Sequence, residues 1–180
     1  MNYNSGKYYN YDNVKINLGS SDRTKEGFLN LDILPVKGVD IVCDLNKSIP
    51  LKDNSVTEVY AGHILEHLDD TIKIMEEIYR VCKNGAVVKI KVPYFKSIDS
   101  FKDPTHKRFF TEETFYYFNT EERKKRALPD YRNRANFKII KIAYLWSSPW
   151  LRFLPFKKCF FMKHFWNIVR TIYFELRVIK

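Results

Sequence analysis

A cluster of ionisable side chains near the middle of the chain has the composition of a proton-transfer site. Asp103, His106, Lys107 and Arg108 fall within six consecutive residues. A histidine, with an unperturbed pKa of about 6.5, can take a proton from a hydroxyl near neutral pH, and two adjacent cations can hold an anionic group. We therefore predict His106 as a general base and the other three as substrate-binding residues. The alternative is a structural loop, in which Asp103 and Pro104 form a turn and His106 bonds to the backbone.

A second segment, residues 63–67, reads His-Ile-Leu-Glu-His. This order matches a zinc-peptidase pattern, in which two histidines and a glutamate lie on one helical turn. A catalytic zinc site needs a third protein ligand, and the sequence downstream shows no convincing one. We therefore expect no metal site, and we expect His67 to cap or pack against a helix.

A glycine and two acids follow three successive apolar runs. Gly19 comes after the first run, Asp32 ends the second and Asp44 ends the third. In an open parallel sheet, ligands lie over the carboxyl ends of the strands. A glycine there lets a ligand approach the backbone, and an acid can accept hydrogen bonds from ribose hydroxyls. Each residue alone is a weak signal, because turns also favour Gly and Asp.

The elements that would position these residues alternate between strand and helix patterns. Apolar residues recur at helical spacing over residues 68–83, where Asp69 and Asp70 lie near the expected start and Asn84-Gly85 forms the expected stop. Such an alternation predicts a mainly parallel α/β sheet. We expect a short helix over residues 111–118, a solvated charge run over 121–126, and strands at 14–18, 27–32, 39–44, 56–60, 86–92, 137–145 and 172–179.

Taken in order, these motifs resemble those of class I S-adenosylmethionine-dependent methyltransferases. The similarity covers about residues 14–118 and is closest to a small prokaryotic group with a shortened first crossover. It rests on Lys15–Ser21, Asn30–Ile33, Cys43–Leu45, Ile49–Ser55, His63–Leu68, Arg80–Gly85 and Val88–Pro93. The resemblance implies a Rossmann-like sheet flanked by helices, S-adenosylmethionine as cofactor and methyl transfer as the activity.

The resemblance also implies roles for individual residues. Gly19 and Ser20 would face the methionine part of the cofactor, and Asp32 would bind the ribose. The adenine would lie between Asp44 and Leu45, and the sulfonium would lie near Gly62 and His63. One departure concerns the glycine loop, where Gly19-Ser20-Ser21 replaces the usual Gly-x-Gly. We expect the Cβ of Ser21 to crowd the cofactor or weaken its binding.

The positive charge of the chain is concentrated in its second part. Residues 101–180 carry 18 of the 31 Lys and Arg and 7 of the 21 Asp and Glu, a net charge of +11, whereas the first hundred residues carry 13 and 14, a net charge of −1. Residues 146–170 hold eight aromatic side chains, five cations and no acid. We expect a basic, aromatic, helical insert before the last strand.

Three interpretations of this insert stay open. It can be a lid that packs its rings into the core, a contact with an anionic membrane surface, or a surface that stacks on nucleic acid. Because no RNA-recognition signature is present, nucleic acid is the weakest of the three.

One 180-residue domain is expected, with a loose arm over residues 1–13. Three widely spaced cysteines and the polar N-terminus predict a cytoplasmic chain, peripheral at the inner face of the membrane if the insert binds lipid.

We predict methyl transfer to a small or a lipid- or glycan-linked acceptor; no signal for an oligomeric state is present. Two alternatives are a cofactor-binding module without catalysis and a membrane- or RNA-binding protein on a Rossmann scaffold. A nicotinamide dehydrogenase is disfavoured, because no Gly-x-Gly-x-x-Gly opens a helix.

Overall fold

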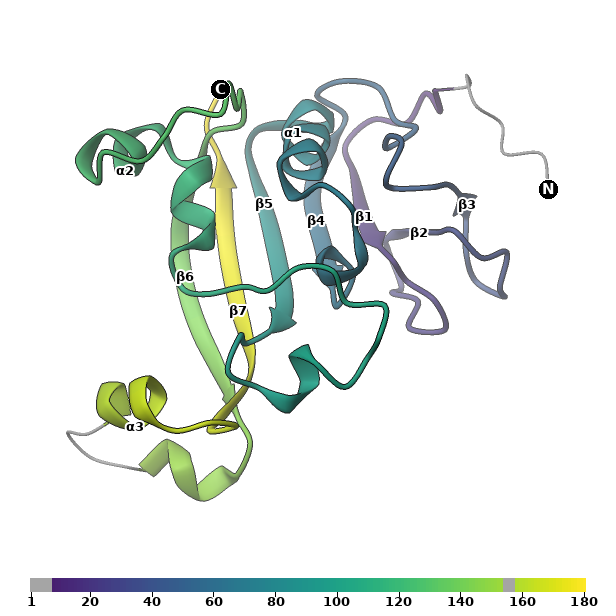
Figure 1. Cartoon of the computed structure of the whole chain (residues 1–180). Helices are drawn as coiled ribbons and strands as arrows, with labels where there is room; N and C mark the ends of the chain where they lie inside the picture. The colour runs from purple at the N-terminus through teal and green to yellow at the C-terminus, as the bar shows by residue number, and fades with distance from the viewer. Residues whose placement is uncertain (1–7, 154–157) are drawn as a thin grey trace.

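A computed structural model of the chain describes residues 8–153 and 158–180. Its centre is one seven-stranded sheet in the order β3-β2-β1-β4-β5-β7-β6 (Figure 1). The strands are β1 (Val14–Leu18), β2 (Leu29–Asp32), β3 (Ile41–Val42), β4 (Val56–Gly62), β5 (Cys82–Pro93), β6 (Phe137–Trp146) and β7 (Val169–Val178).

The sheet is mainly parallel, as predicted. Strands β1 to β5 pair with one another in parallel, whereas β7 runs antiparallel to both of its neighbours, β5 and β6. The chain moves outward from β1 through β2 to β3 and then returns to place β4 on the other side of β1. This reversal creates a switch point between β1 and β4, which is where open α/β sheets bind ligands.

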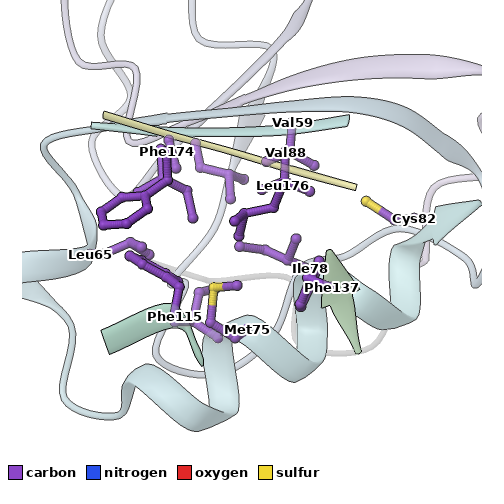
Figure 2. Packing of buried hydrophobic residues seen from close by; sticks show 14 of the residues in the cluster. Val59, Leu65, Met75, Ile78, Cys82, Val88, Phe115, Phe137, Phe174 and Leu176 are labelled. Atoms are coloured by element: carbon purple, nitrogen blue, oxygen red, sulfur yellow. The ribbon is translucent and has the colours of Figure 1, made fainter. Parts of the chain in front are cut away.

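Helix α1 (Thr71–Val81) covers one face of the sheet (Figure 1). Asp70 begins it as N-cap, because its Oδ1 accepts hydrogen bonds from the backbone N–H groups of Ile72 (2.9 Å) and Lys73 (3.0 Å). Met75 and Ile78 point from α1 toward the apolar face of β4 and β5 (Figure 2). The opposite face of these strands is polar, and Lys89 pairs there with Glu58 at 2.7 Å.

Two predicted boundaries of this helix were wrong. Residues 65–67 form a separate 3₁₀ turn, η1 (Leu65–His67), and Leu68 is already extended. The helix ends at Val81, so Asn84-Gly85 does not cap it. Gly85 instead lies inside β5 with φ +80°, where the pairing of β4 with β5 shifts register. An irregular strand uses a left-handed glycine as readily as a helix end does, and sequence alone did not separate the two cases.

The remaining helices are short. They are η2 (Ile98–Ser100), η3 (Thr114–Phe118), α2 (Thr120–Lys125), η4 (Pro149–Phe153) and α3 (Lys158–His164). Thus the helix expected over residues 111–118 is a 3₁₀ helix that starts three residues late, and the charge run is helical. Both η4 and α3 belong to the predicted insert and lie beyond the same end of the sheet as the loop that follows β5 (Figure 1).

The described part of the N-terminal arm contacts the segment that precedes β4. Tyr9 forms a parallel bridge with Leu51, and its N–H donates to the Pro50 carbonyl at 2.9 Å. Tyr9 is thus held in place, residues 1–7 lie outside the described residues, and the loose arm over residues 1–13 stays a prediction. In the part of the chain that the structure describes, every helix is too short or too polar to cross a bilayer.

Candidate active site

A cavity of about 730 Å³ opens at the carboxyl ends of β1, β4 and β5, at the switch point of the sheet. One end of it is formed by the loop after β1, and the other by the loops that follow β4 and β5. Of the predicted site residues, Gly19, Ser20, Gly62, His63, Asp103 and His106 line this cavity. Asp32, Asp44, Leu45, Lys107 and Arg108 do not.

The loop after β1 brings backbone to the cavity surface. Gly19 has φ +63°, and a Cβ at this position would lie 2.6 Å from the side chain of Ile64. Only glycine fits here on both counts. Ser21 has φ +45°, so this serine adopts a conformation that favours glycine. The crowding predicted for its Cβ stays a prediction, but the backbone strain is present.

Ser20 is 2% exposed, and its Oγ makes no hydrogen bond with the described residues. A buried hydroxyl without a partner is uncommon and points to a ligand. Because this hydroxyl belongs to a residue that lines the cavity, the loop fits a small polar cofactor group such as an amine or a carboxylate.

Asp32 supports the loop from beneath. Its Oδ2 accepts the Ser21 N–H at 2.8 Å, and its Oδ1 accepts the Leu34 N–H at 2.9 Å. A carboxylate has about four acceptor sites, so these two bonds leave capacity for ribose hydroxyls. The residue is 8% exposed. Its clearest task in the structure is to fix the shape of the loop.

The residues predicted to frame the adenine have local partners instead of cavity contacts. The Asp44 Oδ1 accepts the Asn46 N–H at 3.0 Å, and its Oδ2 lies 3.7 Å from the Lys47 ammonium. Leu45 is buried in the hydrophobic core. If Asp44 and Leu45 contact the adenine as predicted, the cofactor must reach past the residues that line the cavity.

The end of β4 forms the floor of the cavity. A Cβ on Gly62 would lie 2.7 Å from the ring of Tyr60, and Lys25 lies 4.2 Å above the centre of that ring. His63 has φ +58° and donates its backbone N–H to Lys91 at 2.8 Å. This turn directs the His63 ring toward Glu66, with 3.1 Å between Nδ1 and Oε1.

Beyond His63, three ionisable side chains converge on the cavity. Glu66 and His67 come from η1, whereas His106 comes from the loop after β5. The rings of His67 and His106 meet edge to face, with 4.7 Å between their centres. The backbone N–H groups of Lys107 and Arg108 both donate to the Glu66 carbonyl, at 2.7 and 3.2 Å, and so hold the loop on η1.

The other predicted substrate-binding residues separate into two groups. Asp103 faces the cavity, and hydrogen bonds from Thr105 lower the pKa of its carboxyl group. Its Oδ2 lies 3.8 Å from the Nε2 of His106. Lys107 instead pairs with Asp69 at 2.6 Å, and Arg108 bonds to the Asp69 carbonyl. Both of these cations point away from the cavity.

An ion pair between Asp99 and Arg170, which both line the cavity, was not predicted from the sequence. The Asp99 carboxylate accepts the Arg170 Nε–H at 2.8 Å and pairs with Lys102 at 2.5 Å. Arg170, followed by Lys102, lowers the pKa of Asp99. Since Asp99 and Arg170 are 71 positions apart, only the antiparallel insertion of β7 beside β5 brings them together, and no local pattern could have indicated it.

Comparisons with known proteins were made on the sequence and on the fold. Residues 7–90 match the sequence model of a family described as a methyltransferase domain. A 50-residue stretch is 42% identical to the ubiquinone/menaquinone biosynthesis C-methyltransferase UbiE of Desulfotalea psychrophila. That match spans 27% of this chain and only 20% of UbiE.

Solved structures share the fold at low sequence identity. A SAM-dependent methyltransferase from Archaeoglobus fulgidus superposes with a TM-score of 0.61 at 18% identity, covering 94% of this chain and 88% of that one. The [4+2]-cyclase SpnF gives 0.60 at 14% identity, covering 96% and 77%.

A phosphoethanolamine N-methyltransferase from Haemonchus contortus, solved with S-adenosylhomocysteine, gives a TM-score of 0.55 at 16% identity and covers 96% of this chain and 50% of that one. These likenesses concern the fold. Residues 7–90 therefore resemble methyltransferase domains in sequence, and the described chain has the fold of S-adenosylmethionine-dependent methyltransferases.

Proposed function

We propose that the chain transfers a methyl group from S-adenosylmethionine to a hydroxyl of a lipid-linked acceptor. The observation that carries this proposal is the cavity itself. It joins a glycine loop, whose buried Ser20 hydroxyl has no partner among the described residues, to a group of proton-accepting side chains. The cofactor, when bound, supplies an activated methyl group on a sulfonium. Gly19, Ser20 and Gly62 would hold it, and Asp32 would fix the loop and reach the ribose.

His106 is the residue we assign to the acceptor proton. Its Nδ1 lies 3.1 Å from the carbonyl oxygen of Ser100, which can only accept a hydrogen bond. The proton therefore resides on Nδ1, and Nε2 keeps a lone pair. A hydroxyl in the cavity can pass its proton to this Nε2 while Asp103, 3.8 Å from Nε2, stabilises the resulting cation.

A rim of exposed apolar side chains supports a lipid-linked acceptor. Ile98, Phe101, Phe109 and Trp166 are each at least half exposed, and the rings of Phe109 and Trp166 lie 4.9 and 5.9 Å from that of Phe101. We call these four residues the aromatic rim. It adjoins Lys102, which lines the cavity, and its three aromatic members lie in the basic portion of the chain, residues 101–180. Aromatic rings beside cations suit the interface of an anionic membrane.

Methyl transfer is tested with S-adenosylmethionine labelled in its methyl group. The protein is incubated with detergent-solubilised lipid extracts and, separately, with a panel of water-soluble alcohols and phenols. Label in the organic phase, reduced at least tenfold by His106→Gln, is the expected result. Label only in water-soluble products would contradict a lipid-linked acceptor, and no label despite cofactor binding would support a binding module without catalysis.

Membrane binding is tested by co-sedimentation with phosphatidylcholine vesicles, with and without 30% phosphatidylglycerol. Phe101→Ser combined with Trp166→Ser is expected to reduce binding to anionic vesicles several-fold. The matched control is Tyr131→Ser, an exposed aromatic residue (59%) that lines a separate groove with Phe110 and Phe118. Binding to single-stranded RNA in preference to vesicles would overturn the lipid assignment.

A further inference from the structure

One carboxylate oxygen of Glu66 has no hydrogen-bond partner among the described residues. The residue is 1% exposed, and its Oε1 receives the hydrogen bond from His63. Its Oε2 makes no hydrogen bond with the described residues. Leaving a buried carboxylate oxygen unsatisfied is costly, and the residue lines the cavity. An oxygen in this position is suited to accept a proton or to bind a cation.

In both His67 and His106, hydrogen bonding places the ring proton on Nδ1 and leaves the lone pair on Nε2. The Ser100 carbonyl fixes the proton of His106 on Nδ1. The Nδ1 of His67 lies 2.9 Å from the Oγ1 of Thr105, and that hydroxyl in turn lies 2.7 Å from the Asp103 carboxylate. A carboxylate only accepts, so Thr105 donates to Asp103 and accepts from His67. Both histidines therefore present an Nε2 with a free lone pair.

Fixing Nδ1–H by an oxygen acceptor is how proteins prepare histidines that bind metals through Nε2. One potential ligand atom from each of Glu66, His67 and His106 lies within 4.8 Å of the other two. Two neutral imidazoles and a carboxylate are a donor set typical of Zn²⁺ and of related first-row ions, whereas Mg²⁺ and Ca²⁺ prefer oxygen ligands.

We infer that Glu66, His67 and His106 bind one divalent first-row transition-metal ion, with its remaining coordination positions open to the cavity. Ligand atoms at roughly 2.0–2.2 Å from such an ion are at most about 4 Å apart. The three side chains must therefore close by at most about 1 Å when the ion binds. His67 is partly exposed and His106 lies on a loop, so both have room for this movement.

The consequence for catalysis rests on the proposed function. An ion at this position would coordinate the acceptor oxygen and lower the pKa of its hydroxyl, so that the hydroxyl would release its proton to water in the open cavity. His106 would then act as a ligand, and the ion would replace it as the group that activates the hydroxyl. Metal-free protein would retain the slower route through the His106 imidazole.

The inference is tested by titrating chelator-treated protein with Co²⁺, whose visible absorption reports its coordination, and with Zn²⁺ against a chromophoric chelator. One ion per chain with a dissociation constant of micromolar or below is expected. Glu66→Gln, His67→Ala and His106→Ala should each weaken binding at least 100-fold. The control is His164→Ala, an exposed histidine outside the cavity lining, which should bind as wild type does.

Thr105→Val keeps all three ligands and removes the hydroxyl that joins His67 to Asp103, so it tests the site without the risk that a core variant misfolds. About tenfold weaker binding is expected, as is typical when such a partner is lost. Weak binding that the three ligand variants leave unchanged, or no binding by folded protein, would overturn the inference. Calorimetry with S-adenosylmethionine, in buffer that contains the chelator, separates the two proposals. Protein that binds the cofactor but no metal ion contradicts only the metal site. Protein that binds the metal ion but no cofactor contradicts only the proposed function.

Discussion

The two ends of the cavity are built in opposite ways. The glycine end consists of Gly19, Ser20 and Gly62, which are small, uncharged and lie at the carboxyl ends of strands. The histidine end consists of Glu66, His67 and His106, which are ionisable and come from η1 and from the loop after β5. Each end contains one buried oxygen without a partner among the described residues, Ser20 Oγ and Glu66 Oε2.

The two ends therefore depend on different properties of their residues. The glycine end depends on backbone shape, so it tolerates almost no change in side-chain size. The histidine end depends on charge and hydrogen bonding, so it should tolerate changes of size and respond to changes of protonation. The variants below test this contrast, from the largest expected effect to the smallest.

The largest effect is expected at Gly19. Alanine would adopt a left-handed conformation, which costs about 1–2 kcal/mol, and its Cβ would collide with Ile64, which adds about 1–3 kcal/mol. Gly19→Ala should therefore lower the free energy of unfolding by about 3 kcal/mol in urea denaturation. Gly85→Ala is the matched control, because Gly85 has φ +80° and nothing within 4 Å of its Cβ position. Equal losses in the two variants would show that the glycine loop is not tightly packed.

A change of charge at Glu66 should act in the opposite direction. Glutamine keeps the size and can still accept from His63, but it removes a buried charge with an unsatisfied oxygen. Glu66→Gln should therefore raise the free energy of unfolding of chelator-treated protein by about 1 kcal/mol. Glu113→Gln, at a side chain that is 73% exposed, should change it by less than about 0.5 kcal/mol. Destabilisation by Glu66→Gln would mean that the oxygen has a stabilising partner.

The Asp99–Arg170 pair closes the far wall, and its contribution should depend on pH. Because Arg170 lowers the pKa of Asp99 in the folded state, the ionised pair stabilises the fold above the unfolded pKa of about 3.9. That contribution disappears as the pH falls through the folded pKa. Asp99→Asn should thus lower stability by up to about 1 kcal/mol at pH 7.

The measurement is thermal unfolding of Asp99→Asn and wild type between pH 7 and pH 3. The difference in melting temperature should stay constant from pH 7 to pH 5 and shrink below pH 4. A difference that persists unchanged at pH 3 would contradict the electrostatic origin.

The smallest effect is expected at Ser21. Glycine removes the strain of φ +45° but adds backbone entropy to the unfolded state, so Ser21→Gly should gain about 0.5 kcal/mol or less. If the Cβ of Ser21 also crowds the cofactor, the same variant should bind S-adenosylmethionine several-fold more tightly. Calorimetry of the two proteins decides between these outcomes, because unchanged affinity would limit the serine to a backbone effect.

The glycine end was predictable and the histidine end was not, for a physical reason. Gly19 and Gly62 follow apolar runs directly, so strand prediction also places them. Residues 63–67 show a metal-binding spacing, but the third ligand that we propose, His106, comes from a loop that the Glu66 carbonyl contacts of residues 107 and 108 hold against η1. Such a contact leaves no local pattern in the sequence.

The same reasoning explains the boundaries of the fold. Strong apolar periodicity located the strands of the parallel region and α1 to within a few residues. The ends of α1 depended on which of two adjacent acids caps it, and Asp70 does. The antiparallel direction of β7 depended on pairing across the sheet, which strand periodicity does not encode.

Hydrogen–deuterium exchange with and without S-adenosylmethionine is the most direct test of the account, since it reports both binding and location. The cofactor is expected to slow exchange in residues 17–25 and 60–67 and to leave residues 120–133 unchanged. Absence of protection at millimolar cofactor, or protection confined to segments outside the cavity, would contradict the claim that this cavity is a methyltransferase active site.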